Sequence, residues 1–168
     1  APYPAPFTLL FVPSTLLPPV AGFLAWTLLH AAVLVLYQLR LARAFGFARP
    51  GWLIVAVLLS PPALIQFVMG QVSVWPMVFA GEGLIAFSRV RPLATGAWLA
   101  LLAIKPQSLV LVIPGLARAR QWRVLAGMAA AASGLVAVTS TVGPSWLAGY
   151  TAHLLPFFTA EGTVLTAF

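Results

Sequence analysis

The sequence predicts an all-α fold, a polytopic bundle of transmembrane helices, and three observations support it. Of its 168 residues, 62% are hydrophobic and only 7% are charged, whereas a soluble domain carries about 25% charged residues. Several apolar runs approach the length of about 20 residues that a spanning helix needs. The basic residues gather in short clusters between these runs, which is typical of the loops of a membrane protein.

Five apolar runs are candidate spans. They cover residues 20–39, 52–68, 72–87, 93–117 and 124–142. The second run contains Pro61 and Pro62, and these prolines should bend it because proline breaks helical hydrogen bonding. The last run is rich in small residues between Ala129 and Gly134, the type that lets helices pack closely in lipid.

The segments that flank these runs are expected on the outer side of the membrane. Residues 7–17 are apolar but interrupted by prolines, and they predict a short helix in the outer leaflet. Residues 143–168 form an outer tail with Trp146 and Tyr150, since aromatic residues are enriched at the interface. We expect a single transmembrane domain over 1–168 that is a fragment, because the chain starts without Met and stops in an apolar stretch.

The arginines predict the orientation. Eight of the nine basic residues form three clusters, which are Arg40, Arg43 and Arg49, then Arg89 and Arg91, then Arg118, Arg120 and Arg123. The positive-inside rule places all three clusters in the cytoplasm. Because the charge lies in loops rather than on a soluble basic surface, the net charge of +7 does not indicate a nucleic-acid partner.

The run 93–117 is too short for two spans. Residues 92 to 117, 26 in number, separate Arg91 from Arg118, and two spans need roughly 40 residues. We favour a re-entrant hairpin with Lys105-Pro106-Gln107 at its tip. The alternative is one kinked span that leaves an arginine cluster on the wrong side. Either arrangement places Lys105 beside a polar cavity, since broken helix at membrane depth must be covered by protein or water.

Lys105 is the strongest candidate for a functional residue. It is the only lysine and lies within an apolar run, where insertion scales give a cost of about 2.5–3.5 kcal/mol. Pro106 breaks the helix beside it and Gln107 adds an amide, so the tip suits an anion such as phosphate. The simpler alternative is a lysine that extends to the headgroups. Gln71, at the other outer turn, could contact a phosphate or a sugar, or could cap the turn.

The remaining polar residues suggest structural roles. Glu82 lies about two turns before Arg89, and an ion pair between them, or an acid that extends to the interface, is favoured over catalysis. His30 is expected to be a hydrogen-bonded packing residue. The sequence contains no cysteine and no aspartate, and no cluster has metal-ligand spacing. We therefore expect no metal site and no cofactor.

Several segments resemble glycosyltransferase family 87 in order and spacing. The first is Tyr3-Pro4-Ala5-Pro6-Phe7 with a proline-interrupted run to Trp26. It is followed by Gly70-Gln71, Arg89 to Pro92, Lys105-Pro106-Gln107, Arg118 to Arg123, and then Trp146 and Tyr150 after Gly143-Pro144. The resemblance covers nearly the whole chain, and its most specific element is Lys-Pro-Gln.

The resemblance implies a fold of the GT-C superfamily and its chemistry. Such enzymes take a sugar, often mannose, from a polyprenyl phosphate carrier and transfer it to a lipid or glycan acceptor. Transfer would occur on the outer face of a membrane, here expected to be the bacterial inner membrane. Lys105, Gln107 and Gln71 would bind the donor phosphate, with Tyr3 and His153 at the border of the site. A groove between 52–68 and 93–117 would hold the polyprenyl chain.

The catalytic acid of the superfamily is usually an Asp in the first outer loop. This sequence has no Asp, so the catalytic residue is expected outside this chain, which would then be inactive alone. A transporter or flippase remains the main alternative, because it could use the same broken helix and lysine as an anion site. An inverted repeat would favour that alternative, and an upstream Asp would favour the enzyme. A purely structural subunit would leave the cost of burying Lys105 unexplained.

Overall fold

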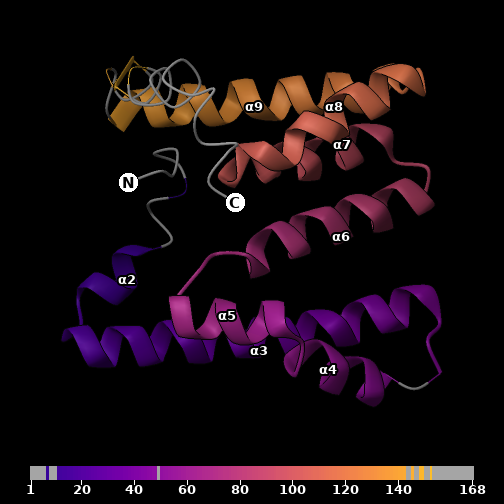
Figure 1. Cartoon of the computed structure of the whole chain (residues 1–168). Helices are drawn as coiled ribbons and strands as arrows, with labels where there is room; N and C mark the ends of the chain where they lie inside the picture. Colours follow the sequence, from indigo (N-terminus) through magenta and orange to yellow (C-terminus); the bar gives the residue numbers. More distant parts are fainter. Residues whose placement is uncertain are drawn as a thin grey trace, which may run out of the picture.

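The computed structural model describes residues 7, 11–48, 50–142, 145, 148–149 and 152. Every element within these ranges is a helix (Figure 1). The predicted all-α class is therefore confirmed for the described part of the chain. Many large apolar side chains on these helices are exposed, among them Leu28, Leu36 and Leu111, as expected of a surface that faces lipid.

Two helices form the amino-terminal part of the described chain. Helix α2 (Val12–Thr15) covers only part of the predicted helix 7–17, of which residues 8–10 lie outside the described ranges. Helix α3 (Pro19–Phe45) begins with a proline at its first position, where the missing N–H costs nothing. It ends at Gly46, whose φ of 70° is left-handed and favours glycine.

The second apolar run is bent, as its prolines predict. Helices α4 (Pro50–Leu58) and α5 (Pro61–Met69) meet at an angle of 57°. Ser60 lies at the bend and accepts a hydrogen bond from the backbone N–H of Ala63 at 3.4 Å. Pro61 follows at the first helical position, so the bend arises where the chain has lost a backbone donor.

The rest of the described chain forms two further helices and a broken one. Helix α6 (Val74–Ser88) is followed by α7 (Pro92–Ala100), the 3₁₀ turns η2 (Leu101–Ile104) and η3 (Pro106–Ser108), then α8 (Leu109–Arg118) and α9 (Trp122–Val142). The chain leaves helical geometry at Lys105, whose φ of −127° and ψ of 85° are extended. Residues before proline favour this region, and the predicted break at Lys105-Pro106 is confirmed.

Only some of these helices are long enough to cross a membrane. By length and composition, α3 and α9 qualify, and the bent pair α4–α5 makes a third if it counts as one span. Helix α6 has 15 residues, or about 22 Å at 1.5 Å per residue, against a hydrocarbon core of about 30 Å. The regions of 72–87 and 93–117 are thus built from shorter apolar helices.

The segment from α7 to α8 folds back on itself. Lys105 contacts Ser73, beside the start of α6, whereas Arg91, just before α7, and Arg120, just after α8, line one cavity. The chain therefore runs along α7 towards Lys105 and returns along α8 (Figure 1). We call residues 92–118 the hairpin.

This path brings the arginine clusters to one end of the bundle, which we call the arginine end. Arg40 and Arg43 border a cavity together with Arg89. Arg91 lines another cavity with Arg120 and Arg123. Arg49 lies outside the described residues.

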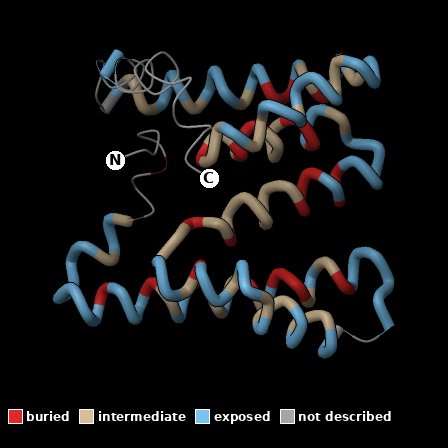
Figure 2. Tube along the Cα trace, viewed as in Figure 1, coloured by how far each residue is buried: buried red, intermediate tan, exposed pale blue. Residues whose placement is uncertain are grey.

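The hairpin is held to α9 by two glycines. A Cβ atom added at Gly96 would lie 2.6 Å from the backbone nitrogen of Met128, and one at Gly127 would lie 2.9 Å from the Cα of Leu93. Glycine thus permits direct backbone contact between α7 and α9. The run from Ala129 to Gly134, expected to supply close packing, is mostly exposed among the described residues (Figure 2), and the close contact is made by Gly96 and Gly127 instead.

Candidate functional site

Lys105 lies at the tip of the hairpin, where backbone geometry fixes its direction. Its backbone N–H donates to the carbonyl of Leu102 and its own carbonyl accepts from Ser108, both at 2.9 Å. Pro106 offers no N–H and prevents a continuous helix through this point. The lysine is thus fixed by turns on both sides, outside the long helices.

The ammonium of Lys105 contacts the turn between α5 and α6. Its Nζ donates to the Oγ of Ser73 at 2.6 Å and approaches the Oε1 of Gln71 at 3.5 Å. The Ser73 hydroxyl in turn lies 3.4 Å from Gln71 Oε1 and donates to it. We call these three residues the lysine cluster, and its members come from two segments more than 30 residues apart in sequence.

The lysine cluster supplies positive charge that no described carboxylate neutralises. Both partners of Lys105 are neutral, and the ion pair found in the described ranges joins Arg40 to Glu82. An ammonium has three protons to donate, so the cluster can bind an anion such as phosphate.

An aromatic and apolar core supports the turn that carries Gln71 and Ser73. Val72 and Ile104, each adjacent to a cluster residue, are buried with Phe7 and Trp26. The indole Nε1 of Trp26 donates to the carbonyl of Gly70 at 3.0 Å. This bond ties the end of α5 to α3, and the left-handed φ of 60° at Gly70 lets the chain turn there.

His30 belongs to the same core. Its Nδ1 lies 2.8 Å from the carbonyl oxygen of Trp26, so Nδ1 carries the proton and donates. Its ring also contacts those of Trp26 and Trp75. The prediction of a hydrogen-bonded packing residue is therefore confirmed.

An apolar slot opens next to Ser73. Its volume is about 160 Å³, and it lies between α3, α4, α5 and α6, with Leu34, Val74 and Met77 among its walls. The groove was expected between 52–68 and 93–117, but residues 93–117 do not line this slot. Helix α5 packs on α3, and the residues that face it across the slot come from α3 and α6 rather than from the hairpin.

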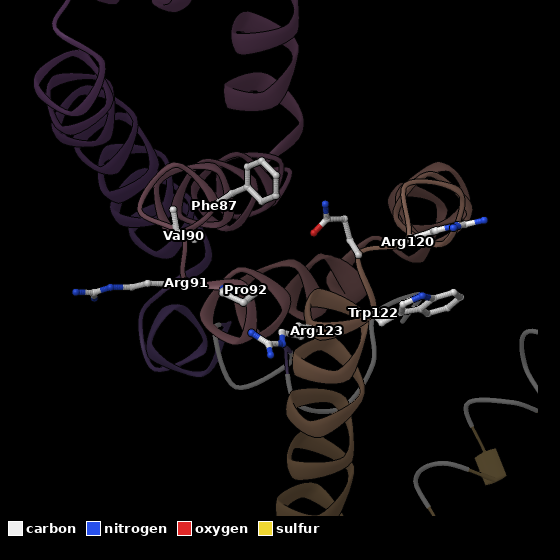
Figure 3. Close-up of a pocket in the computed structure, with 8 residues that line it drawn as sticks. Phe87, Val90, Arg91, Pro92, Arg120, Trp122 and Arg123 are labelled. Carbon is white, nitrogen blue, oxygen red and sulfur yellow. The ribbon is translucent and has the colours of Figure 1, made fainter.

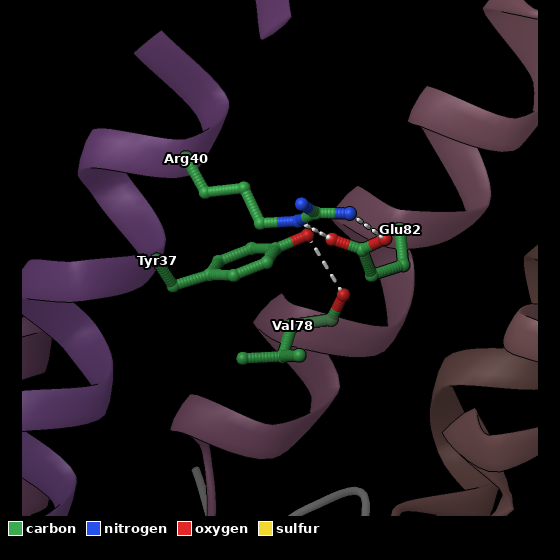
Figure 4. Close-up of polar contacts among 4 residues, drawn as sticks. All are labelled: Tyr37, Arg40, Val78 and Glu82. Atoms are coloured by element: carbon green, nitrogen blue, oxygen red, sulfur yellow. Dashed lines mark hydrogen bonds and ion pairs between the residues drawn. The ribbon is translucent and has the colours of Figure 1, made fainter. Parts of the chain in front are cut away.

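Glu82 is remote from the lysine cluster. Ser73 precedes α6 and Glu82 follows nine residues later, which places them about 13 Å apart along the axis. Glu82 forms a two-pronged ion pair with Arg40, with Nη2 to Oε2 at 2.8 Å and a second contact from Nε (Figure 4). The prediction that Glu82 pairs with Arg89 is wrong, because α3 brings Arg40 alongside α6. The hydroxyl of Tyr37 beside the pair donates to the carbonyl of Val78 at 3.0 Å.

Of the site residues predicted from the sequence, Lys105 and Gln71 lie together in the structure. The side chain of Gln107 is exposed, one residue beyond Pro106. Tyr3 and His153 lie outside the described residues. Ser73 was missed from the sequence, although its position two residues after Gln71, just before an apolar helix, could have indicated it.

Comparison with known proteins identifies one family. The family model of glycosyltransferase family 87 matches residues 2–166, nearly the whole chain. No curated protein and no solved structure matches the chain.

Proposed function

Because this chain belongs to glycosyltransferase family 87, we propose that it transfers a sugar from a polyprenyl phosphate carrier to a lipid or glycan acceptor. The family indicates a glycosyltransferase, which displaces the transporter or flippase alternative. Mannose is the sugar that we propose first. The site would face the outer side of a bacterial inner membrane, opposite the arginine end.

One observation carries the proposal for the donor. The Lys105 ammonium is partly buried and, among the described residues, contacts the neutral groups of Ser73 and Gln71. A buried cation that lacks a counter-ion is costly and marks a functional position. A phosphate group of the donor would supply the missing negative charge and leave Ser73 free to donate to the same anion.

The chemistry follows from where charge develops. During transfer, the bond between the anomeric carbon and the phosphate oxygen breaks, and the carrier leaves as a polyprenyl phosphate with added negative charge. A fixed ammonium stabilises that charge in the transition state, which is the usual electrostatic contribution to catalysis. The acceptor hydroxyl forms the new glycosidic bond and loses its proton to a base.

That base is not a member of the lysine cluster. Lys105 is a cation, and Ser73 and Gln71 are neutral at physiological pH. Glu82 is engaged by Arg40 at the other end of α6. An aspartate base, as the superfamily uses, would come from outside this chain, because its sequence contains none. The lysine cluster thus serves donor binding and departure of the carrier.

The surroundings of the cluster suit a lipid-linked donor. The apolar slot begins at Ser73, so it could take the first isoprene units while the phosphate meets Lys105. The outward orientation is supported by the arginine end, which the positive-inside rule assigns to the cytoplasm. Lys105 lies at the opposite end of α6 from Arg89.

Donor binding by the full chain in nanodiscs tests the proposal. We expect Lys105→Gln to weaken binding of polyprenyl phosphate mannose by about 10- to 100-fold, since a hydrogen bond to a charged group contributes about 1.5–3 kcal/mol. Ser73→Ala should weaken it less, by about 2- to 10-fold. Arg118→Gln removes one charge at the arginine end and should leave the Kd unchanged. Equal affinities for wild type and Lys105→Gln would refute the proposal.

A further inference from the structure

A cavity lies at the arginine end, far from the lysine cluster. Its volume is about 650 Å³, and it lies between the α6–α7 turn and the α8–α9 turn (Figure 3). A second cavity of about 490 Å³ shares Arg91, Pro92 and Arg123 with it. Both cavities border the start of α7, and we call the two together the arginine groove.

The arginine groove carries unbalanced positive charge. Arg91, Arg120 and Arg123 line the larger cavity, and none of its lining residues is acidic. Arg123 lies beside Pro92, while Arg91 and Arg120 extend from opposite sides of the cavity (Figure 3). The cavity thus has positive charge on both sides, and Arg123 is the arginine drawn nearest to its wall at Pro92.

The backbone adds to this attraction. Helices α7 and α9 both begin at the groove, with Pro92 and Trp122 as their first residues, and helix amino termini carry partial positive charge. The two turns are also held in an unusual geometry, because Val90 and Arg120 have φ values of 56° and 54° although neither is glycine. Each of these residues ends the preceding helix, and the next residues, Arg91 and Gln121, donate back to the carbonyls of Ala86 and Leu116, which fixes the turns.

The same groove presents apolar side chains beside its charges. Phe87, Val90 and Trp122 line it with exposed fractions of 50%, 86% and 63%. A free phosphate ion makes no favourable contact with apolar side chains. A phospholipid, in contrast, carries acyl chains directly below its headgroup that can pack against them. Tryptophan is also enriched at the level of the headgroups, so the apolar rim favours a lipid.

We propose that the arginine groove binds the phosphate headgroup of an anionic phospholipid, such as phosphatidylglycerol, from the leaflet at the arginine end. Basic pockets between transmembrane helices bind such headgroups. The bound lipid would neutralise Arg91 and Arg123 and hold the two turns of the hairpin against α9. This site is separate from the lysine cluster and does not depend on which sugar is transferred.

Lipid retention tests the proposal by native mass spectrometry of the full chain. The protein is released from nanodiscs of mixed phosphatidylglycerol and phosphatidylcholine, and inorganic phosphate is added in a parallel arm. We expect one retained phosphatidylglycerol on the wild type, no retained phosphatidylcholine, and no displacement by millimolar phosphate. The double variant Arg91→Gln and Arg123→Gln should lose about 30-fold in affinity, at about 1 kcal/mol for each arginine.

Two further variants keep the test decisive. Arg118→Gln removes a charge at the same end but outside the groove, and it should retain the lipid. Replacing Arg91 and Arg123 with lysine keeps the charges and should keep most of the binding, which separates charge from misfolding. Equal retention by the wild type and the double glutamine variant would overturn the proposal. So would equal loss in Arg118→Gln, or displacement by free phosphate, which would indicate a site for a soluble anion.

Discussion

The contact between α7 and α9 gives a sharp prediction, because two glycines of the same helix differ in their surroundings. A Cβ atom at Gly127 would lie 2.9 Å from the Cα and 3.0 Å from the carbonyl carbon of Leu93, whereas relaxed carbon contacts are about 3.5–4.0 Å. A Cβ atom at Gly134 would meet no atom within 4 Å. Alanine at Gly127 should therefore push the helices apart, and alanine at Gly134 should not.

The size of the effect follows from these distances. Leu93 meets the new methyl group with backbone atoms, which cannot rotate away, and overpacking costs about 1–3 kcal/mol. For a chain of this length, 1 kcal/mol corresponds to about 2–4 °C, so Gly127→Ala should lower Tm by about 2–12 °C. Gly134→Ala should leave Tm unchanged or raise it slightly, because alanine favours helix over glycine by about 1 kcal/mol.

Thermal unfolding of both variants in the same detergent, followed by tryptophan fluorescence, measures the difference. Since α7 leads through η2 to Lys105, we also expect Gly127→Ala to weaken donor binding. Equal melting temperatures for Gly127→Ala and Gly134→Ala would show that α7 and α9 do not meet at this backbone contact.

Two other predictions concern charge. Glu82→Gln breaks the ion pair with Arg40 and should lower Tm by a few degrees, from about 1 kcal/mol, because the Arg40 side chain is 55% exposed and its charge is screened. Arg89→Gln should leave Tm unchanged, and a loss equal to that of Glu82→Gln would contradict the pairing. Lys105→Arg, which keeps the positive charge, should retain most of the donor affinity that Lys105→Gln loses, and equal losses in the two variants would contradict the role of the charge.

The features that depend on local chemistry could be predicted from the sequence. The bend at Pro61 and the break at Lys105 both follow from the missing N–H of proline. The positions of the arginines also indicated which turns share an end of the bundle. That reasoning placed Gln71 and Lys105 on the same side, and the structure brings them into contact.

The features that depend on helix rotation could not be predicted. Whether Gly127 or the run from Ala129 contacts α7 depends on how α9 is rotated about its own axis. Composition does not reveal that rotation. The partner of Glu82 depends on where α3 lies against α6, and Arg40 is 42 residues away in sequence. Ser73 joined the lysine cluster for the same reason, since its contact with Lys105 exists only once the hairpin has folded back.

The central claim is that Lys105 meets a lipid-linked phosphate at the end opposite the arginines. The chain has no cysteine, so Gln107→Cys gives a single, exposed label site beside Lys105, and Arg118→Cys gives a matched one at the other end. In sealed vesicles, a membrane-impermeant maleimide added outside should label the first variant only, and polyprenyl phosphate mannose should block that labelling. Labelling of Gln107→Cys only from the cytoplasmic side, or labelling that the donor lipid does not change, would contradict the account.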